Sequence, residues 1–111
     1  MKMITAMIQP FMLNKVTSAL EAIEDFPGMT ITKVQGFGRR RSLSEQHSFH
    51  IDEFKEKIRI EIITPDEKAS RIVETLVYFA HTGHSGDGKV FVWPVESAVR
   101  IQTGEKDEAA L

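Results

Sequence analysis

The sequence predicts an α+β domain in which a four-stranded antiparallel sheet carries two helices on one face. Two segments have apolar residues at helical spacing, and four have the alternating or β-branched pattern of strands. They follow one another as β-α-β-β-α-β, the order of the split βαβ, ferredoxin-like arrangement. The 111 residues, 41% hydrophobic and 27% charged, fit a single domain over residues 1–111 with a core of its own.

The first part of the chain predicts a strand, a helix and a second strand. Residues 2–9 alternate in the manner of a strand that Pro10 ends. Helical spacing follows, with Asn14 as the expected N-cap, until Pro27-Gly28 ends the helix in a turn. Residues 29–37 are rich in β-branched side chains and predict the second strand. The apolar positions that recur along the helix are Leu13, Val16, Leu20 and Ile23.

A long polar segment precedes the third strand and the second helix. It covers about residues 38–56 and follows no clean period, and loops of this length in compact domains are often functional. Residues 57–64 then alternate cleanly and predict a strand. Pro65 and Asp66 start a helix in which Asp66 is the expected N-cap. The expected buried stripe of this helix is Ala69, Ile72, Val73, Leu76, Val77 and Ala80.

The last part of the chain predicts a glycine-rich loop, a fourth strand over 89–93 and a short irregular end. Pro94 ends the strand, residues 95–101 predict a short turn with a last short strand, and 104–111 predict a loose polar tail. The sheet face opposite the helices still needs cover, so we expect self-association there. The expected members of this face are Met3, Met7, Thr32, Ile63, and Phe91 or Trp93.

Composition excludes several classes of function. The net charge of −2 gives no overall field that would attract nucleic acid or an anionic membrane. The absence of cysteine excludes disulfides and thiol catalysis. No apolar run reaches transmembrane length, and the N-terminal segment is too short and polar for a signal peptide. We therefore expect a cytoplasmic protein that neither binds nucleic acid nor inserts into a membrane.

The loop Thr82–Lys89 is a candidate phosphate site. Three glycines let backbone N–H groups approach an anion, and Lys89 adds a positive charge directly before an apolar strand. The loop lacks the Walker spacing, because Gly88-Lys89 is followed by Val90. The pattern alone also fits a plain turn between a helix and a strand.

Further positive side chains lie at Arg39–Arg41, Lys57 and Arg100. In the predicted sheet, the second strand ends, and the third and fourth strands begin, at the same end of the sheet. Arg39, Lys57 and Lys89 are therefore expected to converge there, where guanidinium and ammonium groups suit phosphate or carboxylate. The alternative is that the arginine run is a solvated loop surface.

Two pairs of histidines raise a metal site as an alternative. His47 and His50 share the long loop, and His81 and His84 flank the glycine turn. Such spacing binds zinc or copper only when the side chains are rigidly held, and no cysteine assists. The sequence also contains no evident set of nucleophile, base and orienting group, so we expect no enzyme.

Six segments form a specific combination that covers nearly the whole chain in order. They are Met1 to Pro10, Gly28-Met29-Thr30, Gly36-Phe37-Gly38-Arg39, Pro65-Asp66, Thr82-Gly83-x-x-Gly86-Asp87-Gly88-Lys89-Val90-Phe91-Val92, and Val99-Arg100-Ile101-x-Thr103-Gly104-Glu105. Together they resemble the PII nitrogen-regulatory signalling proteins. The part that matches poorly is residues 40–55.

The resemblance implies a ferredoxin-like homotrimer with adenine-nucleotide sites in the clefts between subunits. ATP and ADP compete there, and the long loop after the second strand, the T-loop, changes shape to grip or release a target protein. The implied phosphate-binding positions are Arg39, Gly86, Asp87, Gly88 and Lys89. Met7, Gly36 and Ile63 would lie near the nucleotide from the same subunit. The neighbouring subunit would offer Gly28, Met29, Thr30, Glu61 and Arg100.

Three departures from the family pattern bear on the signal. Arg40 replaces the glutamine that coordinates the magnesium between ATP and 2-oxoglutarate, and an arginine cannot ligate a cation. A magnesium cofactor and 2-oxoglutarate sensing are therefore in doubt, although Lys57, which meets that acid in relatives, is present. Gln102 replaces a second family arginine. The only tyrosine, Tyr78, lies on the second helix, so the loop has no site for uridylylation.

The sequence thus predicts a PII-like sensor that binds ATP, ADP or AMP independently of magnesium and switches its loop to regulate a partner, such as a transporter or a metabolic enzyme. One alternative is a sensor of another effector: bicarbonate or a similar small anion beside Lys57 and Arg40, or a heavy metal linked to efflux. A second is a slow nucleotide phosphatase in which Asp87 or Glu61 positions water.

Overall fold

The computed structural model of the chain describes residues 1–37 and 54–111. The predictions that fall on residues 38–53 lie outside the described residues. They concern most of the expected long loop, the arginines Arg39 and Arg40, and the histidines His47 and His50.

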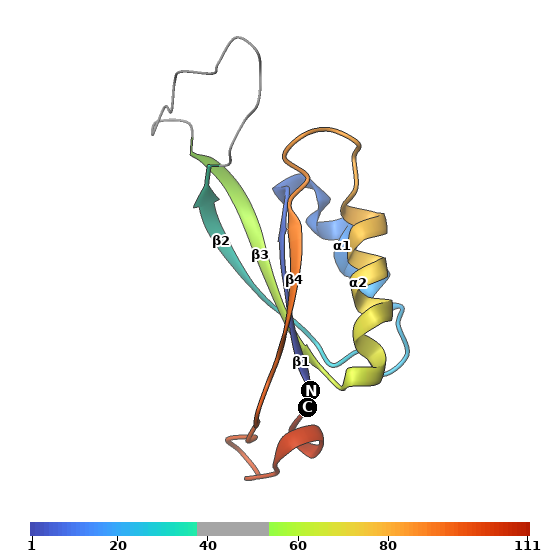
Figure 1. Cartoon of the computed structure of the whole chain (residues 1–111), viewed down its shortest axis with the longest axis vertical. Helices are drawn as coiled ribbons and strands as arrows, with labels where there is room; N and C mark the ends of the chain where they lie inside the picture. Colours follow the sequence, from blue (N-terminus) through green and yellow to red (C-terminus); the bar gives the residue numbers. More distant parts are fainter. Residues whose placement is uncertain (38–53) are drawn as a thin grey trace.

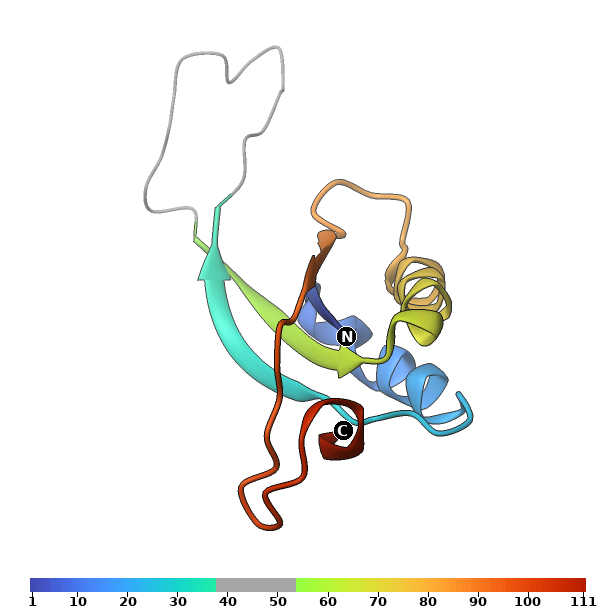
Figure 2. The same cartoon turned by 60° about the horizontal axis from the view of Figure 1, so that its bottom comes forward.

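The described residues form one antiparallel sheet with both helices on one side, as Figures 1 and 2 show. The strand order in the sheet is β2-β3-β1-β4. This arrangement confirms the predicted ferredoxin-like α+β fold. The elements are β1 (Lys2–Ile8), α1 (Leu13–Glu21), β2 (Thr30–Gly36), β3 (Lys55–Thr64), α2 (Asp66–Ala80) and β4 (Lys89–Pro94), with two short 3-10 helices, η1 (Pro10–Met12) and η2 (Asp107–Ala110).

The core lies between the helices and the two central strands. Ile4, Ala6 and Ile8 of β1 pair with Ile62, Ile60 and Ile58 of β3, and all six side chains are buried. Alternation puts every second residue of these strands on the same face, so this pairing forms a continuous apolar layer. Val16 and Leu20 of α1 and Ile72 and Leu76 of α2 pack onto it.

The opposite sheet face, which we call the open face, has no helix or strand from residues 1–37 or 54–111 packed over it (Figure 1). Met3 pairs with Ile63 on one side and Trp93 on the other, and Thr5 pairs with Phe91. Phe91 and Trp93 remain 48% and 45% exposed. The predicted members Met3, Met7, Thr32, Ile63, Phe91 and Trp93 all have the register of this face.

Two of the expected helix caps are wrong. The turn η1 leads directly into α1, with the amide of Met12 donating to the carbonyl of Gln9 at 3.0 Å, so helical backbone begins before Asn14. Pro10 starts this turn because its fixed φ suits a first helical position. Asp66 is the first residue of α2 rather than its N-cap, which is Pro65. Its carboxylate lies 2.9 Å from the α-amino group of Met1.

Two further predictions differ from the structure. Val77 is 55% exposed because the buried stripe of α2 follows Ile72, Leu76 and Ala80, which leaves Val77 on the neighbouring outer face. Strand β3 begins at Lys55, two residues earlier than expected, because its pairing with β2 continues to Gly36.

The end of the chain is more ordered than the loose tail that its polarity suggested. It contains the bridge Val99–Lys106 and the 3-10 helix η2. Among the described residues, no helix is long and apolar enough to cross a membrane.

Candidate functional site

The candidate site lies at the end of the sheet where β2 ends and β3 and β4 begin (Figure 1). The antiparallel register puts Gly36 opposite Lys55, and Met7 opposite Lys89. The prediction that Lys57 and Lys89 share one edge of the sheet is therefore confirmed, whereas their expected companion Arg39 lies outside the described residues. Gly36 lies at the same edge.

The glycine loop, residues 81–88, connects α2 to β4 above this edge. Gly83, Gly86 and Gly88 have positive φ angles of 87°, 92° and 104°, which side chains other than glycine rarely adopt. Gly88 also packs so closely on the end of β1 that a Cβ atom there would lie 1.7 Å from the carbonyl oxygen of Met7. The glycines therefore give the loop its path and its contact with β1.

Lys57 connects β3 to the glycine loop. Its ammonium group donates a hydrogen bond to the carbonyl oxygen of Gly86 at 2.5 Å. Among residues 1–37 and 54–111, Lys57 has no carboxylate partner. A positive charge therefore lies directly beside the loop, and Lys89, exposed at the start of β4, adds a second one at the same end of the sheet.

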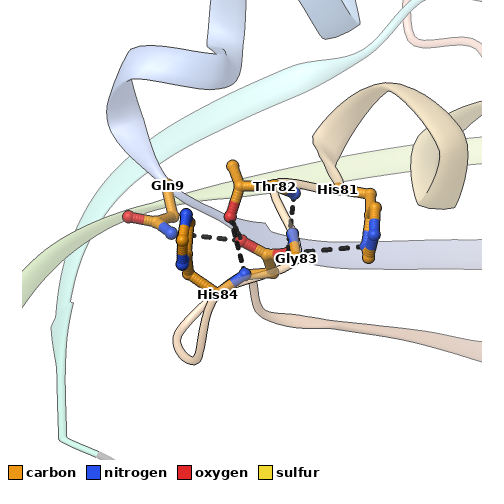
Figure 3. Close-up of polar contacts among 6 residues, drawn as sticks. Gln9, His81, Thr82, Gly83 and His84 are labelled. Carbon is orange, nitrogen blue, oxygen red and sulfur yellow. Dashed lines mark hydrogen bonds and ion pairs between the residues drawn. The ribbon is translucent and has the colours of Figure 1, made fainter.

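Asp87 lies near the end of the loop, and its carboxylate accepts hydrogen bonds from the start of the same loop; Figure 3 shows the labelled partners Thr82, Gly83 and Gln9. Oδ2 accepts hydrogen bonds from the backbone amides of Thr82 at 2.7 Å and Gly83 at 3.0 Å. Oδ1 accepts one from the Thr82 hydroxyl and one from Nε2 of Gln9 at 3.2 Å. The Thr82 hydroxyl, the backbone amides and Gln9 together hold the pKa of Asp87 well below its ordinary value.

The remaining predicted residues are spread along the sheet. Thr30 pairs with Glu61 near the middle of β3, and Gly28 and Met29 lie just before Thr30. Ile63 pairs with Met3, which is four residues along β1 from Met7, or about 13 Å. Within one chain, these residues are therefore not brought to the glycine loop.

Arg100 also lies away from the loop within this chain. It belongs to the segment after β4, where its amide donates to the carbonyl of Glu105 at 2.8 Å and its guanidinium donates to the carbonyl of Leu111 at 3.1 Å. Arg100 is thus held at the other end of the sheet from the glycine loop, since β4 runs from the loop toward this segment.

The histidine pair of the loop, His81 and His84, does not form a metal site in the described part of the chain, where no group of three metal-ligating side chains occurs. His81 lies with Nδ1 3.6 Å from the Asp87 carboxylate, so its nearest ionic contact is an acid already held by other donors. The backbone amide of His84 donates to the Thr82 hydroxyl at 3.2 Å.

Sequence reasoning did not identify two residues that shape this site. Gln9 lies 78 positions from Asp87, and a single glutamine at a strand end gives no signal of such a contact. Thr82 was part of the recognised loop motif, but its bonds to Asp87 became apparent only from the fold.

Comparisons with known proteins identify the family. The family model described as "Nitrogen regulatory protein P-II" matches residues 1–105. The chain is 43% identical over 113 aligned positions to a nitrogen regulatory protein P-II of Haemophilus influenzae, with 100% of both chains covered. It is 42% identical to nitrogen regulatory protein P-II 1 of Escherichia coli and 43% identical to a P-II protein of Synechocystis, again over 100% of both chains. On this agreement of fold, motifs and full-length identity, the chain belongs to the nitrogen regulatory protein P-II family.

Proposed function

We propose that this protein is a cytoplasmic P-II sensor that binds an adenine nucleotide between the subunits of a homotrimer. The nucleotide sets the shape of the loop after β2, and that loop presents or withholds a surface for a target protein, such as a transporter or a metabolic enzyme. The protein acts by binding rather than by catalysis. Its ligand shifts the loop between states by contacting one of them better than the other.

The observation that carries this proposal is the glycine loop beside the end of the open face that carries Lys57 and Lys89, which we call its charged end. The amides of Ser85 and Gly86 have no hydrogen-bond partner in the described part of the chain. Amides in a turn with positive φ angles form a concavity that suits an anion. Lys57 and Lys89 add positive charge at the same end, so the phosphates of a nucleotide are the expected occupants.

The trimer is supported by two features of the single chain. The open face leaves Phe91 and Trp93 about half exposed, and a second copy that covers them would remove this apolar area from water. Residues expected at the nucleotide, including Gly28, Glu61 and Arg100, lie far from the glycine loop of their own chain. A neighbouring subunit is needed to bring equivalents of these residues to the loop.

Calorimetry with ATP, ADP and AMP, each with and without magnesium, tests the proposal. We expect binding without magnesium, with ADP or AMP at least comparable to ATP, because Arg40 replaces the metal-coordinating glutamine of typical relatives. Lys89→Ala should weaken all three nucleotides about 10-fold or more, since a charged hydrogen bond is lost. Strict dependence on magnesium would contradict the metal-independent site, and an unchanged affinity in the lysine variant would remove Lys89 from it.

A small anion is the second candidate effector. Lys57 has a neutral carbonyl as its hydrogen-bond partner, so an incoming carboxylate or bicarbonate would gain a charged partner there. Repeating the nucleotide titrations with 2-oxoglutarate or bicarbonate present tests this candidate. An effector that binds at Lys57 should change nucleotide affinity in the wild type but not in Lys57→Met.

A further inference from the structure

The carboxylate of Asp87 has little capacity left for any ligand. An ionised carboxylate offers about four lone-pair positions. The Thr82 hydroxyl and Gln9 use those of Oδ1, and the amides of Thr82 and Gly83 use those of Oδ2. With its side chain only 21% exposed, Asp87 would have to break these bonds before it could bind a magnesium ion or a ribose hydroxyl.

The direction of the carboxylate also suits a site for anions. A carboxylate that faced the loop's concavity would repel phosphate. Because it points inward, the carboxylate accepts hydrogen bonds from the amides of Thr82 and Gly83, and the amides of Ser85 and Gly86 stay available for a ligand. The negative charge thus orders one side of the loop while the other side remains open to an anion.

Gln9 attaches this arrangement to the sheet. It follows the last residue of β1, and its side chain reaches the Asp87 carboxylate at 3.2 Å (Figure 3). Gly88 rests on the same end of β1 through its contact with Met7. The position of the loop relative to Lys57 and Lys89 therefore depends on contacts at both Asp87 and Gly88.

We propose that Asp87 is a positioning residue that holds the glycine loop in its phosphate-binding shape through Thr82, Gly83 and Gln9, and that it contacts neither phosphate nor magnesium. This inference rests on the proposed nucleotide site and deepens it. Preorganisation of this kind strengthens binding because the loop is already ordered when the ligand arrives. Asp87 then has a different role from Gly86, Gly88 and Lys89, its neighbours in the motif.

The binding test compares Asp87→Asn and Gln9→Ala with the control Glu74→Gln, which removes an exposed carboxylate from the outer face of α2. Asparagine keeps the size of the side chain but loses an acceptor oxygen and the charge. Asp87→Asn should weaken ATP and ADP about 10-fold, equally with and without magnesium, and leave adenosine binding unchanged. Gln9→Ala should weaken the same ligands about 3-fold, and Glu74→Gln should have no effect.

Two outcomes of this titration would overturn the inference. Tighter ATP binding by Asp87→Asn would show that the carboxylate faces the phosphates and repels them. A loss that occurs only with magnesium present would show that Asp87 is a metal ligand.

Nuclear magnetic resonance of the unliganded protein separates this inference from the proposed function. In Asp87→Asn, the amide protons of Thr82 and Gly83 should shift upfield and exchange faster with solvent, because their charged acceptor is lost. Unchanged amides would overturn the positioning role whatever the protein binds. If the wild type binds no nucleotide, the proposed function fails while the amide measurement still decides the role of Asp87 in shaping the loop.

Discussion

The two faces of the sheet differ in how far the described part of the chain covers them. On the face under the helices, Ile4, Ile60 and Ile62 are at most 1% exposed, and they belong to one core cluster with residues of α1 and α2. On the open face, Phe91 and Trp93 stay about half exposed. The covered face therefore accounts for the fold of the single chain, whereas the open face has apolar surface that the described part of the chain leaves exposed.

The open face is also divided along its length. Its apolar part contains Met3, Ile63 and Trp93, which pair across three adjacent strands. Toward the glycine loop, the register brings in Lys57 and Lys89 instead. We infer that the apolar part serves assembly and the charged end serves the ligand, so changes on the two faces should affect different properties of the protein.

The largest effect on stability should come from the covered face. Ile60→Ala should lower the free energy of unfolding by about 2–5 kcal/mol, because it leaves a cavity at a fully buried position. Ile31 is the matched control: it pairs directly with Ile60 on the neighbouring strand but is 46% exposed. Urea denaturation should show a loss below about 1.5 kcal/mol for Ile31→Ala, and equal losses would contradict the assignment of the core.

The next effect should appear in assembly. Trp93→Glu puts a charge on the apolar part of the open face and should cost association about 2 kcal/mol or more per interface, as at a central aromatic residue. Light scattering should then show a fall from three chains to one. Val92→Glu is the control, since Val92 is similarly exposed but points to the other side of β4. A trimer that survives Trp93→Glu would remove the open face from the interface.

A smaller effect on stability should come from the contact between the glycine loop and β1. Gly88→Ala introduces a Cβ atom where the Met7 carbonyl lies, so the loop or the strand end must move, at a cost of about 1–3 kcal/mol. Gly104 also has a positive φ of 74°, but nothing lies near the position of an added Cβ atom. The control Gly104→Ala therefore measures the cost of backbone strain without a clash. Thermal unfolding should show the larger loss for Gly88→Ala, and equal losses would show that the loop relaxes freely.

The sequence predicted the covered face well for a physical reason. Burial of a sheet face against helices repeats every two residues in the strands and near 3.6 in the helices, so residues such as Ile58, Ile60 and Leu76 follow a visible period. The errors fell where period is not the deciding factor. Asn14 is not the N-cap of α1, because the turn that starts at Pro10 leads into the helix before it. Val77 follows the buried Leu76 on α2 but lies outside the buried stripe.

The position of the candidate site could be predicted from the sequence, but the roles of its individual residues could be predicted less well. Glycine and lysine placed before a strand indicated the loop, and topology alone brought Lys57 to it. The inward turn of Asp87 could not be predicted, because its partner Gln9 is distant in sequence and carboxylates at loop positions commonly face solvent. The open face was likewise expected, but only the register shows where its apolar part gives way to charge.

The smallest effect should be on how stability depends on pH: the contribution of the loop to stability should change with pH, whereas the contribution of the core should not. Because the hydrogen bonds to Asp87 lower its pKa in the folded protein below the ordinary value of 3.8, they stabilise the fold fully above that value and progressively less as the pH falls below it. Thermal unfolding at about pH 5 and about pH 3, both below the usual titration range of imidazoles, should show a larger fall in Tm for the wild type than for Asp87→Asn. Ile60→Ala, which removes only apolar contacts, should lose the same Tm relative to the wild type at both values. An identical acid response in the wild type and Asp87→Asn would mean that the carboxylate is not bound by the loop in solution, and the charged end of the open face would then lack the preorganisation that separates it from an ordinary turn.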